Sequence, residues 1–170
     1  VATITAEVDL NKLLENVVGE ITRMLDAERS TLFINDPKTN ELFSRVSQGD
    51  NVGEIRLPNH VGIAGTVFTS GETLNIPHAY ADLRFNPGFD KKTGYFTQSV
   101  LCCPITTKEG EIIGVSQVLN KKGGPFTDED ESRLRAFTTQ VAISLENSKL
   151  FDDVQNMKNY SDGMLQSMSN

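Results

Sequence analysis

Between positions 10 and 25, apolar residues recur every three or four positions, which is the spacing of one face of an α-helix. These residues are Leu10, Leu13, Leu14, Val17, Val18, Ile21 and Leu25. Asp9 immediately precedes them and is a suitable N-cap. The pattern therefore predicts an amphipathic helix over residues 9–26.

The middle of the chain changes to short runs rich in Val, Ile, Leu and aromatic residues, which are typical of β-strands. Such runs lie at 29–34, 41–47, 54–57, 73–76, 99–107 and 111–120. The first two flank a turn at 36–40 and the last two flank Lys108-Glu109-Gly110, so each pair predicts a hairpin. The second hairpin is expected near the centre of the sheet. The segment that starts at Gly62 predicts a short helix ending at Gly71.

Residues 77–94 form a long polar and aromatic connection between two of these strands. A connection of this length inside a compact domain is usually either functional or disordered. Because the segment contains Tyr80, Phe85 and Phe89, we favour a functional role for it.

The C-terminal part of the chain predicts one long helix. Thr127 is a good N-cap, and the acidic residues at 128–131 oppose the macrodipole in the first turn. A helical apolar stripe continues without proline to Asn170, although Gly163 weakens its last part. We expect one domain over 1–150, with its helix at 9–26, its sheet and lid at 29–120 and the start of the last helix at 127–150. Residues 151–170 are expected to be a helical connector, either a parallel coiled coil or a signalling helix, that leads to an output domain or a second domain of the same kind.

Composition and charge narrow the function classes. Sixteen basic and twenty-three acidic side chains give a net charge of −7 without a cluster of Lys and Arg, which argues against nucleic-acid binding. No apolar stretch approaches the ~18 residues that span a bilayer. We therefore expect a soluble, cytoplasmic protein without a membrane partner. The chain begins Val-Ala-Thr, so we expect it to be a fragment of a larger protein.

The sequence contains no recognisable catalytic or metal-binding motif. Cys102 and Cys103 are adjacent, which gives neither a disulfide framework nor the spaced ligand pairs of a zinc site. His60 and His78 lie far apart, and no nucleophile elbow, phosphate-binding lysine loop or dinucleotide glycine pattern is present. We expect no catalytic residues, no metal, no cofactor and a reducing intracellular setting.

A more specific motif follows the last predicted strand. Asn120-Lys121 precedes Phe126, and Asp130-Glu131 follows Phe126 after three residues, which matches the NKFDE motif. With this motif and its order of elements, the chain resembles GAF domains, above all the tandem regulatory GAF domains of cyanobacterial adenylate cyclases and then those of cyclic nucleotide phosphodiesterases. The resemblance implies an α+β fold, the GAF fold, in which a central antiparallel sheet has helices on one face and a ligand-covering lid on the other.

The motif residues carry separate expectations. An ion pair between Lys121 and Asp130 could tie the last helix to the sheet, and in the family this pair is taken to frame the pocket and not to touch the nucleotide. An exposed pair of little energetic value is the alternative. Phe126 is expected to fill the core, and Asn120 and Glu131 are expected to make local hydrogen bonds and caps.

The resemblance also implies a cyclic nucleotide ligand and residues that hold it. Thr93, which precedes Gly94, and Thr97 correspond to threonines that bind the phosphate and ribose, and Asp90 corresponds to an acidic position in the lid. Ala64 matches a site where a small side chain lets the backbone approach the ligand. Ordinary helix capping by the threonines and tight packing at Ala64 remain alternatives.

The identity of the base depends on Gln117. An amide can donate to one atom and accept from its neighbour, which suits adenine, whereas a carboxylate suits guanine, and guanine-binding relatives carry Glu at this position. Arg29 and Thr31 match positions at the base end of the pocket, and Ser47 and Gln48 match positions behind the base. Together they favour cAMP over cGMP, with an ordinary sheet-face role for Gln117 as the alternative.

We therefore expect a regulatory sensor and not an enzyme. It is expected to bind cAMP, to form a homodimer through its terminal helices, and to control a covalently linked output domain, an adenylate cyclase or a phosphodiesterase. Three alternatives remain: a dimerisation module without a physiological nucleotide, a cGMP-selective sensor, and a bilin photosensor. The segment 82–97 contains no cysteine to which a bilin could attach, which disfavours the photosensor.

Overall fold

The structure is a computed structural model that describes residues 2–48 and 54–169, with side chains at 10–45 and 54–148. Its centre is a six-stranded antiparallel sheet in the order β3-β2-β1-β6-β5-β4. The strands are β1 (Ala27–Asp36), β2 (Glu41–Gln48), β3 (Arg56–Pro58), β4 (Leu74–Ile76), β5 (Val100–Thr106) and β6 (Ile112–Lys121). Both expected hairpins are confirmed, and β6 of the second lies beside β1 in the middle of the sheet.

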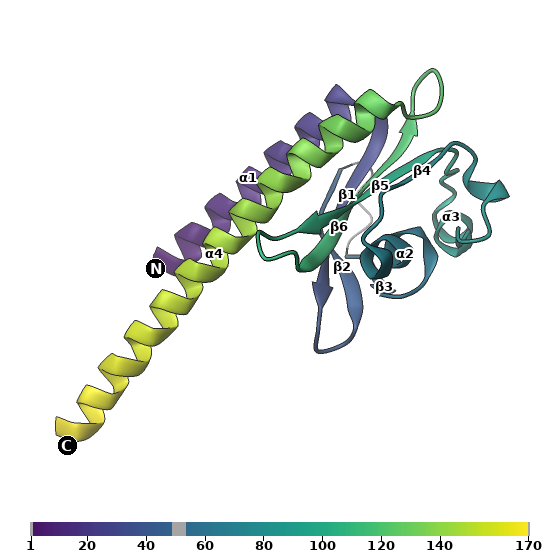
Figure 1. Cartoon of the computed structure of the whole chain (residues 1–170). Helices are drawn as coiled ribbons and strands as arrows, with labels where there is room; N and C mark the ends of the chain where they lie inside the picture. Colours follow the sequence, from purple (N-terminus) through teal and green to yellow (C-terminus); the bar gives the residue numbers. More distant parts are fainter. Residues whose placement is uncertain (1, 49–53, 170) are drawn as a thin grey trace.

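The helices divide between the two faces of this sheet. The described helices are α1 (Ala2–Met24), α2 (Gly62–Ser70), a 3₁₀ turn (Ala79–Ala81), α3 (Gly88–Thr93) and α4 (Asp128–Ser169). Figure 1 shows α1 and α4 side by side on one face and α2 and α3 on the other, with α4 extending far beyond the sheet. This arrangement confirms the expected α+β architecture with helices on one face and a lid on the other.

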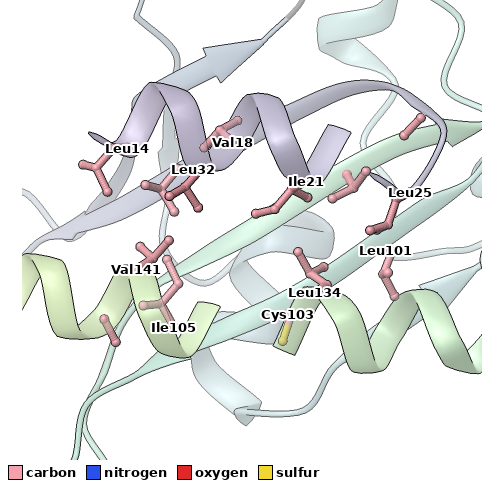
Figure 2. Close-up of a cluster of buried hydrophobic side chains, with 14 of the residues drawn as sticks. Leu14, Val18, Ile21, Leu25, Leu32, Leu101, Cys103, Ile105, Leu134 and Val141 are labelled. Carbon is pink, nitrogen blue, oxygen red and sulfur yellow. The ribbon is translucent and has the colours of Figure 1, made fainter. Parts of the chain in front are cut away.

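The core between the sheet and the two long helices is aliphatic. Leu14 and Ile21 from α1, and Leu25 just after it, meet Leu134 and Val141 from α4 over the sheet, and each is at most 1% exposed (Figure 2). Burying one such side chain stabilises the fold by roughly 1.5–3 kcal/mol relative to leaving it in water. These are the positions that the helical spacing predicts to face inward.

The boundaries of some elements differ from the sequence expectations. Helix α1 begins at Ala2, seven residues before the expected N-cap Asp9. Gly71 ends α2 in the left-handed conformation, as expected. The connection after β4, expected only as a long segment, contains the 3₁₀ turn and α3. These helices are three and six residues long, too short for a periodic pattern to reveal them.

Asn120 interrupts the alternation of side chains along β6. Val118 belongs to the core under α1 and α4, and Leu119 packs against the core on the other face. Continued alternation would direct Asn120 to the helices and Lys121 to the lid. The contacts are the reverse, because Asn120 has a φ of 59°, a left-handed conformation that Asn adopts more readily than most residues.

The expected ion pair between Lys121 and Asp130 is present and joins the sheet to the first turn of α4. Asp130 is only 1% exposed, so this is not an exposed surface pair. Thr127 and Asp130 also form a capping box, in which each backbone N–H donates to the other side chain. Burial raises the pKa of Asp130, but the Lys121 ammonium and the bonds from Thr127 outweigh it and lower the pKa below its usual range.

We expect Lys121→Met to lower the free energy of unfolding by about 2 kcal/mol at neutral pH, because it leaves the buried Asp130 charge without its cation. The pKa of Asp130 is lower when folded, so the bridge stabilises the protein above about pH 4 and loses this effect as pH falls through the folded pKa. Urea unfolding at pH 7 and pH 3.5 should show the difference between variant and wild type shrink at the lower pH.

Arg133→Met is the matched control, because Arg133 pairs with Glu129 on the exposed surface of the same helix turn. Arg133→Met should lower the free energy of unfolding by less than about 0.5 kcal/mol. Equal losses in the two variants would contradict a structural role for the Lys121–Asp130 bridge.

Candidate functional site

A cavity of about 370 Å³ lies between the sheet and the lid, which we define as residues 77–99. Its floor is the sheet face that carries Arg29, Thr31 and Phe33 of β1. The register pairs Thr31 with Gln117 and Arg29 with Leu119 on β6, and both partners line the same floor. The volume falls within the range of about 300–1,000 Å³ that is typical of small-molecule sites.

Six of the nine predicted ligand residues line this cavity, namely Arg29, Thr31, Ala64, Asp90, Thr97 and Gln117. They come from β1, α2, the lid and β6, so the fold brings together residues that are up to 88 positions apart in the chain, from Arg29 to Gln117 (117 minus 29). This grouping is compatible with a shared ligand, and the individual ligand roles stay predictions.

The other three predicted residues are placed differently. Thr93 is exposed and is not among the cavity-lining residues, because its hydroxyl donates to the Phe89 carbonyl and accepts from the Tyr95 N–H at the end of α3. This is the helix-end role that the sequence left open. Ser47 and Gln48 pair with Thr31 and Ser30 in the β1–β2 register, and their side chains lie outside the described residues.

Asp90 joins two distant parts of the lid through hydrogen bonds. Its carboxylate is 6% exposed and accepts the Thr97 hydroxyl, the Thr97 N–H and the Tyr80 hydroxyl, each at 2.8 Å. The bond to Asp90 raises the pKa of Tyr80. Since the hydroxyl proton of Thr97 is directed to Asp90, this hydroxyl presents its remaining lone pair to the cavity as an acceptor.

Asn120 fastens the lid to the sheet. Its Oδ1 accepts the N–H groups of Gln98 and Ser99 at 2.6 and 3.1 Å, and its Nδ2 donates to the Tyr95 hydroxyl at 2.9 Å and the Phe96 carbonyl at 2.8 Å. Hydrogen bonding by Asn120 was predicted, but its reach to the lid, more than twenty residues away in sequence, was not.

The remaining motif residues have separate positions. Phe126 is 4% exposed in the core under α1 and α4, which confirms its expected packing role. Glu131 pairs with Arg135 one turn along α4. This bond is local, as expected for Glu131, while the cap bonds at the start of α4 are made by Thr127 and Asp130.

The N-terminus of α2 opens into the cavity. Gly62, Ile63 and Ala64 line it, and the N-cap Val61 makes no side-chain cap hydrogen bond. The first N–H groups of a helix have no partner within the helix and carry partial positive charge, which suits an anionic group. A side chain on Gly65 would approach the His60 backbone at 2.9 Å, so only glycine allows this close turn.

Several features of the site were not expected from sequence. Tyr95 stacks on Arg29, with the guanidinium carbon 3.8 Å from the ring centroid, and donates its hydroxyl to Glu28 at 2.8 Å. Hydrogen bonds from Asn120 and Tyr95 lower the pKa of Glu28, and burial raises the pKa of Tyr95. The aromatic content of the lid was the available signal for Tyr95, whereas Glu28 gave none.

Within the part of the chain that the structure describes, no three His, Cys, Asp or Glu side chains gather as metal ligands. Cys102 and Cys103 are both buried in β5, and burial raises the pKa of each thiol. Among the described helices, none is long and apolar enough to cross a bilayer.

Comparison with known proteins identifies related domains by sequence. The model of the GAF domain family matches residues 9–145. The chain is 36% identical over 162 residues to the probable 3′,5′-cyclic phosphodiesterase pde-5 of Caenorhabditis elegans, covering 87% of this chain and 22% of the relative. It is 39% identical over 164 residues to the dual 3′,5′-cyclic-AMP and -GMP phosphodiesterase 11A of Takifugu rubripes, covering 89% and 18%. The chain thus spans about a fifth of these relatives.

Solved structures agree with the fold. The GAF domain from a phosphoenolpyruvate-protein phosphotransferase of Coxiella burnetii superposes with a TM-score of 0.77 at 25% identity, covering 88% of this chain and 92% of that one. The corresponding domain from Acinetobacter gives a TM-score of 0.73 at 21% identity, covering 85% and 86%.

We expect Asp90→Asn to open the lid locally, because an amide NH2 replaces an acceptor in a cluster of three donors and leaves a buried donor without an acceptor. The local cost should be about 1–3 kcal/mol. Hydrogen exchange of the Thr97 amide should then become faster. Asp82→Asn is the control, since the Asp82 carboxylate accepts hydrogen bonds from Arg84 in the same lid, and an equal effect there would contradict the role of Asp90.

Asn120→Gly should release the lid while keeping the backbone, because glycine adopts positive φ without steric cost. The amides of Gln98 and Ser99 should exchange faster. Asn120→Ala should lose the same lid bonds and a further ~1 kcal/mol of stability from backbone strain. Asn40, with a φ of 57° in the β1–β2 turn, provides matched Gly and Ala variants. Lid exchange that changed equally in the Asn40 variants would overturn the assignment.

Proposed function

The chain belongs to the GAF domain family, and we propose that it is a regulatory domain that binds a cyclic nucleotide, cAMP in preference to cGMP, under its lid. The observation that supports this most is the cavity between the sheet and the lid, in which Arg29, Gln117, Thr97 and the start of α2 converge on one space of about 370 Å³. An apolar pocket with a few placed polar groups is typical of small-molecule recognition.

The phosphate is proposed to lie at the start of α2. The N–H groups of Gly62, Ile63 and Ala64 border the cavity there, and such groups bind anions without a cluster of basic side chains. This chemistry suits a domain with a net charge of −7. The Thr97 hydroxyl, which already donates to Asp90, would accept a hydrogen bond from the ribose hydroxyl.

The base is proposed to lie on the sheet near Gln117. Its amide carries both a donor and an acceptor, which matches the adjacent amino group and ring nitrogen of adenine. Thr31 pairs directly with Gln117 across the strands, so the two side chains can address one edge of the base. Behind the base, we propose a supporting role for Ser47 and Gln48. In the lid, we propose that Asp90 and Thr93 hold the segment in shape.

Ligand binding is proposed to be relayed through α4 to a covalently linked output domain, an adenylate cyclase or a phosphodiesterase. Helix α4 is 42 residues long, and only its first part covers the sheet (Figure 1). Residues 151–170 would form the connector. A homodimer through the terminal helices is supported by exposed apolar side chains on them, Leu13 and Met24 of α1 and Ile143 of α4, each 41–46% exposed.

The same exposed side chains favour a second candidate, a dimerisation module without a nucleotide ligand. The two functions differ in their response to cyclic nucleotides. A sensor gains about 2.7 kcal/mol of stability at a hundredfold ligand excess over its dissociation constant, whereas a module without a ligand gains none.

Isothermal titration of the ligand-stripped domain should show tighter binding of cAMP than of cGMP. We expect Gln117→Glu to shift this preference toward cGMP by about tenfold, because a carboxylate accepts both donors on the guanine edge but repels the adenine acceptor. The shift is measured as the ratio of the two dissociation constants.

Gln140→Glu is the matched control, because it adds the same charge on an exposed position of α4 outside the cavity. It should leave the ratio unchanged. An unchanged ratio in Gln117→Glu would refute base reading by Gln117, and binding of neither nucleotide by the wild type would favour the dimerisation module.

A further inference from the structure

Tyr95 links the lid to two neighbouring strands of the sheet, β1 and β6. It belongs to the lid, its ring covers the Arg29 guanidinium of β1 at 3.8 Å, and its hydroxyl contacts Glu28 of β1 and Asn120 of β6. The ring therefore contacts Arg29, which lines the cavity. The hydroxyl is held where the start of β1 lies beside the end of β6.

The hydroxyl contacts fix the ring in direction as well as position. Tyr95 Oη donates to Glu28 Oε1 at 2.8 Å and accepts from Asn120 Nδ2 at 2.9 Å, so both its donor and an acceptor site are used. Asn120 also contacts Glu28 at 3.1 Å, which closes a triangle of three polar groups. A ring held at its para oxygen in this way cannot swing away from Arg29 without breaking these bonds.

Arg29 has a long side chain with many rotamers, and placing its guanidinium in a cavity loses conformational entropy. A cation over an aromatic face is stabilised electrostatically, and a planar guanidinium also stacks on the ring. The ring of Tyr95 can therefore select one orientation of Arg29 before a ligand arrives. Arg29 presents only hydrogen-bond donors, so its placement decides where acceptor atoms of a ligand can lie.

We propose that Tyr95 is a positioning residue that orients Arg29 for the ligand when the lid is closed, with Glu28 and Asn120 holding Tyr95. Opening the lid removes the ring from Arg29, so the base end of the cavity is complete only in the closed state. Lid closure then contributes to ligand selection as well as to burial. This inference rests on the proposed function for its ligand, but the placement of Arg29 is a property of the protein alone.

A double-mutant cycle with cAMP tests the dependence on Arg29. We expect Tyr95→Leu and Arg29→Met each to weaken cAMP binding about tenfold, and the double variant to bind no worse than Arg29→Met within about twofold, because Tyr95 acts through Arg29. Tyr95→Phe keeps the ring but loses the hydroxyl bonds to Glu28 and Asn120 that hold it, so its affinity should lie between those of the wild type and Tyr95→Leu. Independent, multiplicative losses in the double variant would overturn the proposal.

Tyr80→Phe is the matched control on the same lid, because it removes a hydroxyl bond to Asp90 without touching Arg29. A lid that is simply loosened should weaken binding equally in Tyr80→Phe and Tyr95→Phe and should combine with Arg29→Met multiplicatively. A positioning role predicts this multiplicative behaviour for Tyr80→Phe alone.

A ligand-free measurement separates this inference from the proposed function. In the NMR spectrum, the side-chain resonances of Arg29 should carry a ring-current shift from Tyr95 that Tyr95→Leu removes, Tyr95→Phe reduces and Tyr80→Phe preserves. Unchanged Arg29 resonances in Tyr95→Leu would overturn the positioning role. Binding of neither nucleotide by the wild type would refute the proposed function, and the Arg29 resonances would then decide the positioning role by themselves.

Discussion

The left-handed backbone at Asn120 is the constraint on which the two sides of the sheet depend. By interrupting the alternation of β6, it directs Asn120 to the lid and Lys121 to α4. Two adjacent residues thus anchor the moving cover of the cavity and the helix that leaves the domain. A displacement of either partner acts on the same short stretch of backbone.

The consequence is a mechanical connection that needs no long chain of contacts. The lid reaches Asn120 through the backbone of Phe96, Gln98 and Ser99, and α4 reaches Lys121 through Asp130. Packed interiors respond to such displacements by switching between discrete arrangements and not by bending continuously. Under the proposed function, a ligand that favours the closed lid would act on the start of α4 through this stretch of backbone.

Few of the side chains that line the cavity are charged. Its polar groups are mostly neutral, and the charged Asp90 is enclosed by three hydrogen-bond donors from the lid. The Arg29 guanidinium is stacked on the ring of Tyr95, so the lid contacts the only arginine among the described residues that line the cavity.

The sequence by itself determined the elements whose signals are local. Helical spacing predicted the inward residues of α1, the capping residue Thr127 marked the start of α4, and the NKFDE spacing pointed to the Lys121–Asp130 pair. Six of the nine predicted ligand residues line one cavity because family resemblance carried positions that no periodicity encodes.

Only the tertiary structure decided what depends on contacts between distant segments. It assembled Glu28, Tyr95 and Asn120 from three parts of the chain. The helix α3 and the helix-end bonds of Thr93 are local, but the helix is too short to show a period in the sequence. The contacts among Glu28, Tyr95 and Asn120 could not be read from the sequence for another physical reason: they form only when the lid lies on the sheet, and strand pairing brings β1 and β6 together across eighty or more residues.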